Sequence, residues 1–215
     1  MIDLSGLGGL TSISDDFLSD CSGLVSIDLS GLFGVTSIGN KFLYGCRGLV
    51  DIDLSEMVEL RSIGDQFLYR CGELDVIDLS GLTGVTSIGN LFLSLCGELV
   101  DIDLSGMTGL TSIGDQFLYC SSGLLGIDLN GLSSVTSIGH DFLSGCNELV
   151  SVDFSGMTRL TSIGYLFLSG CSGLINVTVI NRSLVSNIID RIEINDLFTV
   201  TRNISEGTAV IETSI

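Results

Sequence analysis

Residues 24–48 read LVSIDLSGLFGVTSIGNKFLYGCRG, and the same pattern returns every 25 residues through most of the chain. Written as a consensus, the unit is L-x-x-I-D-L-S-G-L-x-x-V/L-T-S-I-G-x-x-F-L-x-x-C-x-x. Its first leucine recurs, without insertion or deletion, as Leu24, Leu49, Leu74, Leu99, Leu124, Leu149 and Leu174. A constant period of roughly 20–50 residues indicates a solenoid, in which each unit buries its apolar side only against the neighbouring units. We therefore predict a stack of about seven coils.

The repeat divides the chain into two predicted parts. Residues 1–173 form the solenoid, and its first unit, residues 1–23, lacks the two leading positions. After residue 173 the F-L-x-x-C segment does not return, and strand-like runs follow at residues 188–194, 197–204 and 209–215. We interpret residues 174–215 as a β-rich C-terminal cap, because the last layer of a solenoid must be covered, or else as the start of a further β module.

A second period of 50 residues lies inside the first. Units that begin at residues 24, 74 and 124 carry leucine and valine at the positions of Leu32 and Val35, whereas the units between them carry methionine and leucine at the positions of Met57 and Leu60. Alternating shapes allow neighbouring layers to interlock at native packing density. Duplication of a 50-residue ancestor produces the same pattern, and the two explanations are compatible.

Each unit is predicted to contain two short strands and a tight turn. In residues 27–29 the polar Asp28 lies between two aliphatic side chains, which is the alternation of a half-buried strand. Residues 35–38 form a second extended stretch. Asn40 then occupies the position of a helix N-cap, and apolar side chains of residues 42–46 follow at helical spacing. We expect one short helical or 3₁₀ turn there.

The order of these features is shared with a known repeat. A strand of the form L-x-x-I-x-I/L is followed by L-x-x-I-G and then, at a fixed separation, by a cysteine, as Ile38-Gly39 and Cys46 illustrate. In these features residues 1–173 resemble the leucine-rich repeat, specifically the BspA-like type of bacterial and protist surface proteins. Two segments differ from the BspA-like repeat. Residues 42–43 stand where that repeat has Ala-Phe, and residues 30–32 stand where it usually has a proline.

The resemblance implies a fold and a role. The fold is an α/β repeat solenoid that is mostly β, a right-handed coil with a parallel sheet on one face. The role is a non-enzymatic adhesion or protein-recognition module with a protein or glycan partner, extracellular or at a cell surface. No signal peptide is visible after Met1, and an intracellular location stays open.

The charge of the chain is strongly acidic. There are 26 Asp and Glu residues against 8 Lys and Arg, a formal net charge of −18. A field of this sign repels phosphates, which excludes nucleic-acid binding through a basic patch and docking on anionic lipid. No apolar run approaches the ~18–20 residues of a membrane helix, so membrane insertion is not expected.

The aspartates of the I-D-L segments are predicted to form a column on the solvent side of the main sheet. Carboxylates in adjacent coils would stand ~5 Å apart, and their repulsion, roughly 0.8–3 kcal/mol, opposes pairing. We expect this repulsion to raise their pKa values, and added salt or calcium to raise the melting temperature. The column is either a solvated acidic surface or a strip that binds cations or a partner. The candidate binding residues are Asp28, Asp51, Asp53, Asp78, Asp101, Asp103 and Asp128.

No cofactor or tight metal site is predicted. Calcium prefers several oxygen ligands from a closed loop, which a flat ladder does not supply, so that only weak calcium binding is compatible with the column. The single histidine, His140, cannot complete a usual Cys/His zinc site. Phosphate loops, G-x-S-x-G elbows and H-E-x-x-H motifs are all missing from the sequence, so we predict that the protein is not an enzyme.

Serine and cysteine form two further columns. Serine recurs at the position of Ser37, beside a threonine in most units. We expect it to face inward and satisfy backbone groups; facing outward, the Thr-Ser rows could match a lattice such as ice or a polysaccharide.

Cysteine recurs at the position of Cys46, with Cys120 one place out of register. Parallel stacking places these side chains too far apart for disulfides, so we predict a reduced ladder in the core beside a spine of phenylalanines.

The two ends carry weaker signals. Asn176, Asn181 and Asn203 begin N-x-S/T sequences and are glycosylation candidates. The first coil enters in mid-strand, which would leave its apolar edge without a covering layer. We therefore consider end-to-end self-association into a filament or matrix as an alternative to recognition and adhesion, and lattice binding as a third.

Overall fold

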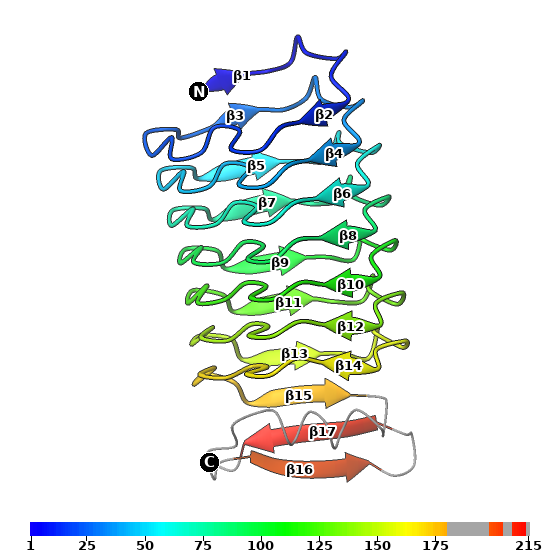
Figure 1. Cartoon of the computed structure of the whole chain (residues 1–215). Helices are drawn as coiled ribbons and strands as arrows, with labels where there is room; N and C mark the ends of the chain where they lie inside the picture. The colour runs from blue at the N-terminus through cyan, green and yellow to red at the C-terminus, as the bar shows by residue number, and fades with distance from the viewer. Residues whose placement is uncertain (180–197, 204–207, 214–215) are drawn as a thin grey trace.

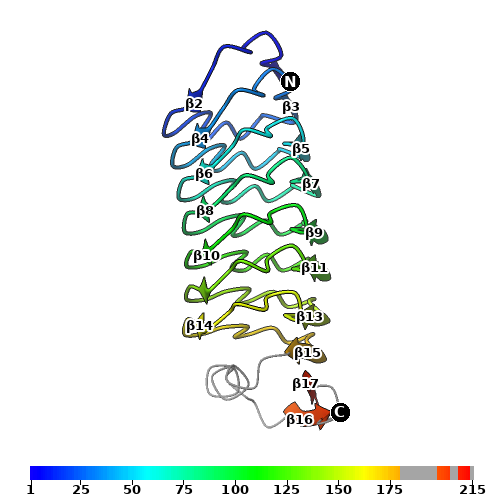
Figure 2. The same cartoon turned by 90° about the vertical axis from the view of Figure 1, so that its right-hand side faces the viewer.

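The computed structural model describes residues 1–179, 198–203 and 208–213. Successive 25-residue units form coils that stack along one axis (Figures 1 and 2). The rings of Phe42 and Phe67, one repeat apart, stack with their centroids at 5.4 Å. The prediction that equivalent residues are vertical neighbours is therefore confirmed, and the coil is mostly β, as expected.

Two columns of short parallel strands run along the stack. The main face contains β1 (Ile2–Asp3), β3 (Ile27–Asp28), β5 (Asp51–Asp53), β7 (Val76–Asp78), β9 (Asp101–Asp103), β11 (Gly126–Asp128), β13 (Ser151–Asp153) and β15 (Asn176–Val179). The second face contains β2 (Ser12–Ile13), β4 (Ser37–Ile38), β6 (Ser62–Ile63), β8 (Ser87–Ile88), β10 (Ser112–Ile113), β12 (Ser137–Ile138) and β14 (Ser162–Ile163). The second face is one continuous seven-stranded sheet.

The main face, in contrast, is joined in pairs of coils. Hydrogen-bonded ladders join β1 to β3, β5 to β7, β9 to β11 and β13 to β15, but not one pair to the next. Within a pair the backbones are very close, since a Cβ on Gly81 would lie 2.2 Å from the carbonyl oxygen of Ser55. Between pairs the spacing is looser: a Cβ on Gly106 would lie 3.2 Å from the oxygen of Ser80 and one on Gly156 would lie 2.7 Å from Cα of Asn130, and Glu56 occupies the equivalent position of another coil. The 50-residue period of the sequence thus corresponds to alternating tight and loose junctions.

The predicted helical turn is wrong, because the segment after each second-face strand alternates in backbone handedness. Gln66, Leu68 and Arg70 have φ values of 61°, 53° and 63°. This left-handed conformation costs a non-glycine residue about 1–2 kcal/mol. The Gln66 amide donates to the carbonyl of Asn90 in the next coil (2.7 Å), and the Leu68 amide donates to that of Phe42 in the preceding coil (2.9 Å). Hydrogen bonds between coils therefore replace those of a helix and offset the backbone strain.

The residues expected to cap a helix bridge coils instead. Oδ1 of Asp15 accepts a hydrogen bond from the amide of Asn40 (2.7 Å), and Oδ1 of Asn40 accepts one from the amide of Asp65 (2.8 Å). The same bond continues through Asn90 and Asp115. Aspartate and asparagine alternate, so that no two charged members are adjacent and like-charge repulsion is small.

The core consists of the apolar columns between the two faces. Neighbouring phenylalanine rings from Phe17 to Phe167 stack at centroid distances of 5.0–5.8 Å, which confirms the aromatic spine. All seven cysteines are free, as predicted. In the buried ones, Sγ donates to a carbonyl 28 residues earlier, as from Cys96 to Leu68 (3.2 Å). Ser121 occupies the cysteine position in its coil and makes the equivalent bond to Leu93 at 2.9 Å, so the column supplies a hydrogen-bond donor to each coil.

The buried thiols should resist alkylation in the native protein. Burial raises the pKa of Cys46 to about 11 and that of Cys96 to about 12, so neither forms the reactive thiolate near neutral pH. We expect iodoacetamide at about pH 8 to modify only the two half-buried thiols, Cys21 and Cys120, and all seven in urea. Intact-mass spectrometry counts the adducts, and rapid addition of more than two to the native protein would contradict this packing.

The C-terminal segment extends the main face with antiparallel strands. In β15, Val177 is in parallel register with Val152 of β13. Strand β17 (Thr208–Thr213) pairs antiparallel with β15, and β16 (Phe198–Asn203) pairs with β17 (Figure 1). The strand-like runs at 197–204 and 209–215 are confirmed over residues 198–203 and 209–213, whereas the run at 188–194 lies outside the described residues. The assignment of residues 174–215 to a cap stays a prediction.

Candidate functional site on the acidic main face

Each aspartate of the I-D-L column is held by the turn that follows its strand. Oδ1 of Asp53 accepts a hydrogen bond from the amide of Ser55, and Oδ1 of Asp78 accepts one from the amide of Ser80, both at 2.8 Å. All seven members of the column make this bond, at 2.7–2.9 Å. A hydrogen bond from a backbone amide to a carboxylate is charge-assisted, and it offsets the repulsion within the column.

This bonding changes the expected pKa of two aspartates in the column, Asp3 and Asp78. The side chain and then the amide of Ser5 hold the pKa of Asp3 below its ordinary value, and those of Ser80 do the same for Asp78. The prediction that repulsion raises the pKa is therefore wrong for these two residues. A carboxyl group with a lowered pKa stabilises the fold above its ordinary pKa, and this contribution is lost as the pH falls through the lowered value. At Asp3 and Asp78, acid should therefore weaken the fold rather than strengthen it.

Two substitutions of Asp78 separate its role as acceptor from its charge. Asp78→Ala leaves the Ser80 amide without its acceptor and should lower the free energy of unfolding by about 1 kcal/mol. Asp78→Asn keeps an oxygen acceptor and removes a charge from the column, so it should remain within about 0.5 kcal/mol of the wild type at pH 7. Urea unfolding followed by circular dichroism, at about pH 7 and pH 3, measures both variants, and each should lose less stability in acid than the wild type. An asparagine variant as unstable as the alanine variant would show that charge, and not the acceptor, matters.

The seven candidate binding residues all lie on the main face. Asp28 and Asp128 are half-buried and the other five are exposed. The second carboxylates, Asp51 and Asp101, are separated by Val76, which pairs in register with Asp51. They are therefore two coils apart, about 10 Å. No group of three or more His, Cys, Asp or Glu residues that could hold a metal ion occurs in the part of the chain that the structure describes. Weak calcium binding stays a prediction.

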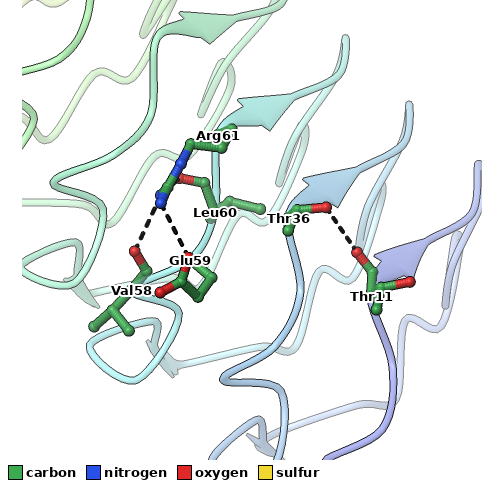
Figure 3. Close-up of polar contacts among 6 residues, drawn as sticks. All are labelled: Thr11, Thr36, Val58, Glu59, Leu60 and Arg61. Carbon is green, nitrogen blue, oxygen red and sulfur yellow. Dashed lines mark hydrogen bonds and ion pairs between the residues drawn. The ribbon is translucent and has the colours of Figure 1, made fainter.

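The serine column faces solvent, which corrects the expectation that it faces inward. In β4, Ser37 lies on the outer side and Ile38 is buried, and the same alternation holds in all seven strands of the second face. A two-residue strand that buries its isoleucine must direct the neighbouring side chain outward. The threonines beside this column bond to backbone instead: Oγ1 of Thr36 donates to the carbonyl of Thr11 at 3.0 Å (Figure 3).

Arg61 interrupts the threonine column and binds within its own coil. Its Nη1 donates to the carbonyl of Val58 at 3.2 Å, and its Nη2 donates to the carboxylate of Glu59 at 3.0 Å (Figure 3). The side chains of both Arg61 and Glu59 are about half exposed, so this ion pair contributes little to stability. The guanidinium is nonetheless neutralised locally and does not reduce the acidity of the main face.

A row of exposed aliphatic residues borders the acidic column and was missed by the sequence analysis. We call it the aliphatic stripe. Its members are Val25, Val50, Val76, Val100, Leu125, Val150 and Ile175. The sequence contained a pattern that could have revealed this stripe, because a Val, Leu or Ile directly follows the first leucine of most units. Only in the coil that begins at Leu74 is the order reversed, because Asp75 takes the stripe position and Val76 the next one.

The match to a family model identifies this repeat. The model describes the BspA type leucine rich repeat region, and six copies match within residues 5–107 and 61–192. The chain belongs to the BspA-type leucine-rich repeat family. The resemblance inferred from the sequence is thereby confirmed, together with the solenoid fold.

One solved structure is similar to this BspA-type solenoid. It is the crystal structure of the T. pallidum leucine rich repeat protein, with 19% sequence identity and a TM-score of 0.58 over 86% of this chain and 78% of that chain. At this level of identity the similarity shows a shared fold. No curated protein matches the chain.

The remaining candidate residues of the BspA-type repeat have structural surroundings. His140 belongs to the bridging column, where Nδ1 accepts the amide of Tyr165 at 2.9 Å and the two rings stack at 5.2 Å. Asn176 lies half-buried in β15, whereas Asn181 and the side chain of Asn203 lie outside the described residues, so glycosylation stays a prediction. The described part of the chain contains no helix with the length and hydropathy needed to cross a bilayer.

Proposed function

We propose that this BspA-type solenoid is a non-enzymatic recognition and adhesion module at the cell surface that binds a protein or glycan partner through its acidic main face. Membership of the leucine-rich repeat family supports a protein-interaction role. The observation that carries the proposal is the amide bond to Oδ1 of every column aspartate, because it holds the carboxylates in one orientation at a spacing of ~4.8 Å. A pre-oriented array loses less entropy on binding than mobile side chains do.

The same regularity argues against catalysis. Acid–base chemistry with two carboxyl groups needs two unlike environments that separate their pKa values. The column aspartates share one hydrogen-bonding arrangement, since each accepts from the amide two residues later. A periodic array of like charges is suited to binding a complementary surface.

The proposal is tested with two variants that remove equal charge. The test variant carries Asp53→Asn, Asp78→Asn and Asp103→Asn, and the control variant carries Asp16→Asn, Asp20→Asn and Asp141→Asn. Asparagine keeps the acceptor for the turn amides, and the control positions lie in the left-handed turn away from the main face. Binding to a glycan array and to immobilised extracellular-matrix proteins is then measured at one ionic strength. We expect the test variant alone to lose about tenfold or more in affinity; equal binding by the test variant and the wild type would overturn the proposal.

End-to-end self-association is a second candidate, favoured by the exposure of Leu7 and Leu10 in the first coil. A further coil stacked in register on this end would meet Ser14, which stands where the later coils have glycine. A Cβ at the equivalent Gly39 would lie 2.6 Å from the amide nitrogen of Asp15 in the preceding coil. Stacking there would therefore need a different geometry from that within the chain. Sedimentation at micromolar concentrations tests this candidate, and a monomer at every concentration would overturn it.

Lattice binding is a third candidate, favoured by the outward-facing serines. The seven strands of the second face present one serine each on a continuous sheet. Ice-growth inhibition and co-sedimentation with crystalline polysaccharide test it. Replacing Ser87 and Ser112 with lysine should abolish any such activity, whereas unchanged activity would exclude this face.

A further inference from the structure

The aliphatic stripe is an unusual surface for an acidic protein. Apart from Val100, which is half-buried, its members are 40–57% exposed. Single exposed aliphatic side chains are common, but a continuous row along a whole face marks an interaction site. The amides of Asp75 and Val76 both donate to the carbonyl of Val50, and the amide of Val150 donates to the carbonyl of Leu125, so the members lie beside one another in successive coils. In the coil that begins at Leu74, the exposed Asp75 takes the stripe position and Val76 lies in register with Asp51, so the row is displaced by one residue there.

Carboxylates border the stripe on both sides along the chain. Asp51 and Asp101 directly follow stripe residues, and the continuous I-D-L column lies two residues further on. Two residues before the stripe position, Glu73, Glu98 and Glu148 are exposed. A partner that covers the apolar row therefore meets negative charge on either side of it.

This combination excludes several occupants. A second copy of the chain carries the same net charge of −18 and would be repelled, as would nucleic acid or an anionic membrane. Charge complementarity favours a cationic partner that also has an apolar row. Electrostatic steering would accelerate its association, while burial of the aliphatic side chains would supply affinity.

The spacing selects the shape of the partner. The stripe crosses six coil intervals, from Val25 to Ile175, which is roughly 29 Å at ~4.8 Å per interval. Along an α-helix, one face returns about every 5.4 Å, a difference of only about 0.6 Å per turn. Same-face residues of a strand recur about every 6.8 Å and lose register after two steps. A helix of about 19 residues spans the stripe.

From this geometry we infer that the aliphatic stripe and its flanking carboxylates form the docking site for an amphipathic, basic α-helical segment of a partner protein. The helix lies along the solenoid axis, with an aliphatic row against the stripe and lysine or arginine side chains on both flanks. This inference rests on the proposed recognition function and names its partner class.

A synthetic peptide tests the inference directly. The probe is a 19-residue helix with leucine at i, i+3, i+4 and i+7 spacing and lysine on both flanks. We expect a Kd on the order of 10–100 µM by fluorescence anisotropy, weakened about tenfold when NaCl is raised from about 50 to 300 mM. A scrambled peptide of the same composition should bind at least about tenfold more weakly. Equal binding of the scrambled peptide, or no binding of the designed one, would overturn the inference.

Matched variants locate the site. Leu125→Ser with Val150→Ser alters the stripe, and Phe33→Ser with Val58→Ser removes two apolar side chains of similar, slightly greater exposure elsewhere in the coils. Only the stripe variant should weaken peptide binding, by about tenfold. All four positions are at least 40% exposed, and circular dichroism checks that both variants fold. Equal effects of the two variants would overturn the inference.

The same measurements separate this inference from the proposed function. Suppose that the stripe variant binds the helical peptide as tightly as the wild type does, while the test variant with Asp53, Asp78 and Asp103 replaced loses its glycan or matrix ligand. The acidic face is then a recognition site, and the helix-docking inference alone fails. If instead the stripe variant loses peptide binding and the aspartate variant binds the array as the wild type does, the helix-docking inference holds. The proposed recognition through the acidic aspartates then fails.

Discussion

Replacing Phe92 with alanine is expected to lower the free energy of unfolding by about 3–5 kcal/mol. The side chain is fully buried, and its ring stacks on those of Phe67 and Phe117 at 5.0 and 5.5 Å. Alanine leaves a cavity between two coils, which the periodic backbone closes poorly because each coil is held by both neighbours. Urea denaturation followed by far-UV circular dichroism measures the loss.

Phe17→Ala is the matched control for this prediction. Phe17 is only half-buried and stacks on a single ring, that of Phe42, at 5.8 Å. Its replacement should cost about half as much. In a solenoid, coupling passes only between neighbours, so the Phe92 variant should also show a second unfolding transition as the two halves separate. Equal losses and a single transition for both variants would contradict the one-dimensional coupling.

The second large effect is expected at the tight junctions of the main face. Gly81→Ala places a Cβ 2.2 Å from the carbonyl oxygen of Ser55, which is backbone and cannot turn away. The two coils must separate, and we expect a loss of about 3 kcal/mol or more. The same urea denaturation measures it.

Gly106→Ala is the control at a loose junction. Its Cβ would lie 3.2 Å from the oxygen of Ser80, a distance that a shift of a few tenths of an ångström relieves. Alanine also reduces the entropy of the unfolded chain, so the net change should stay within about 1 kcal/mol. If both variants lose the same stability, the coils are evenly spaced and the 50-residue period has no structural counterpart.

The alternation of tight and loose junctions affects where the stack tolerates an amino-acid substitution. Glu56 is accommodated at a loose junction, at the position where Gly31 and Gly81 are required at tight ones. Among the equivalent residues from Gly6 to Gly156, the one substitution of glycine is therefore found where the junction leaves room for a side chain.

Much of the fold follows from the sequence, and the reasons are specific. A leucine every 25 residues without insertion makes equivalent residues vertical neighbours, and this predicted the phenylalanine spine, the free cysteines and the aspartate column. The candidate site was predicted only in part. Its aspartates were found, but the aliphatic stripe was not, because Val50 and its equivalents stand beside the buried Leu49 column and read as core residues.

The sequence by itself determined the coil, its register and the residues that fill its interior, because repetition at a constant spacing leaves only one way to align the units. The tertiary structure alone decided three other features. These are the left-handed residues such as Leu68 in place of a helical turn, the outward direction of Ser37, and the hydrogen bonds from the side chain and the amide of Ser80 that lower the pKa of Asp78. All three depend on backbone angles and on the distance between coils, and the energy of a hydrogen bond to the neighbouring coil does not appear in the pattern of any single unit.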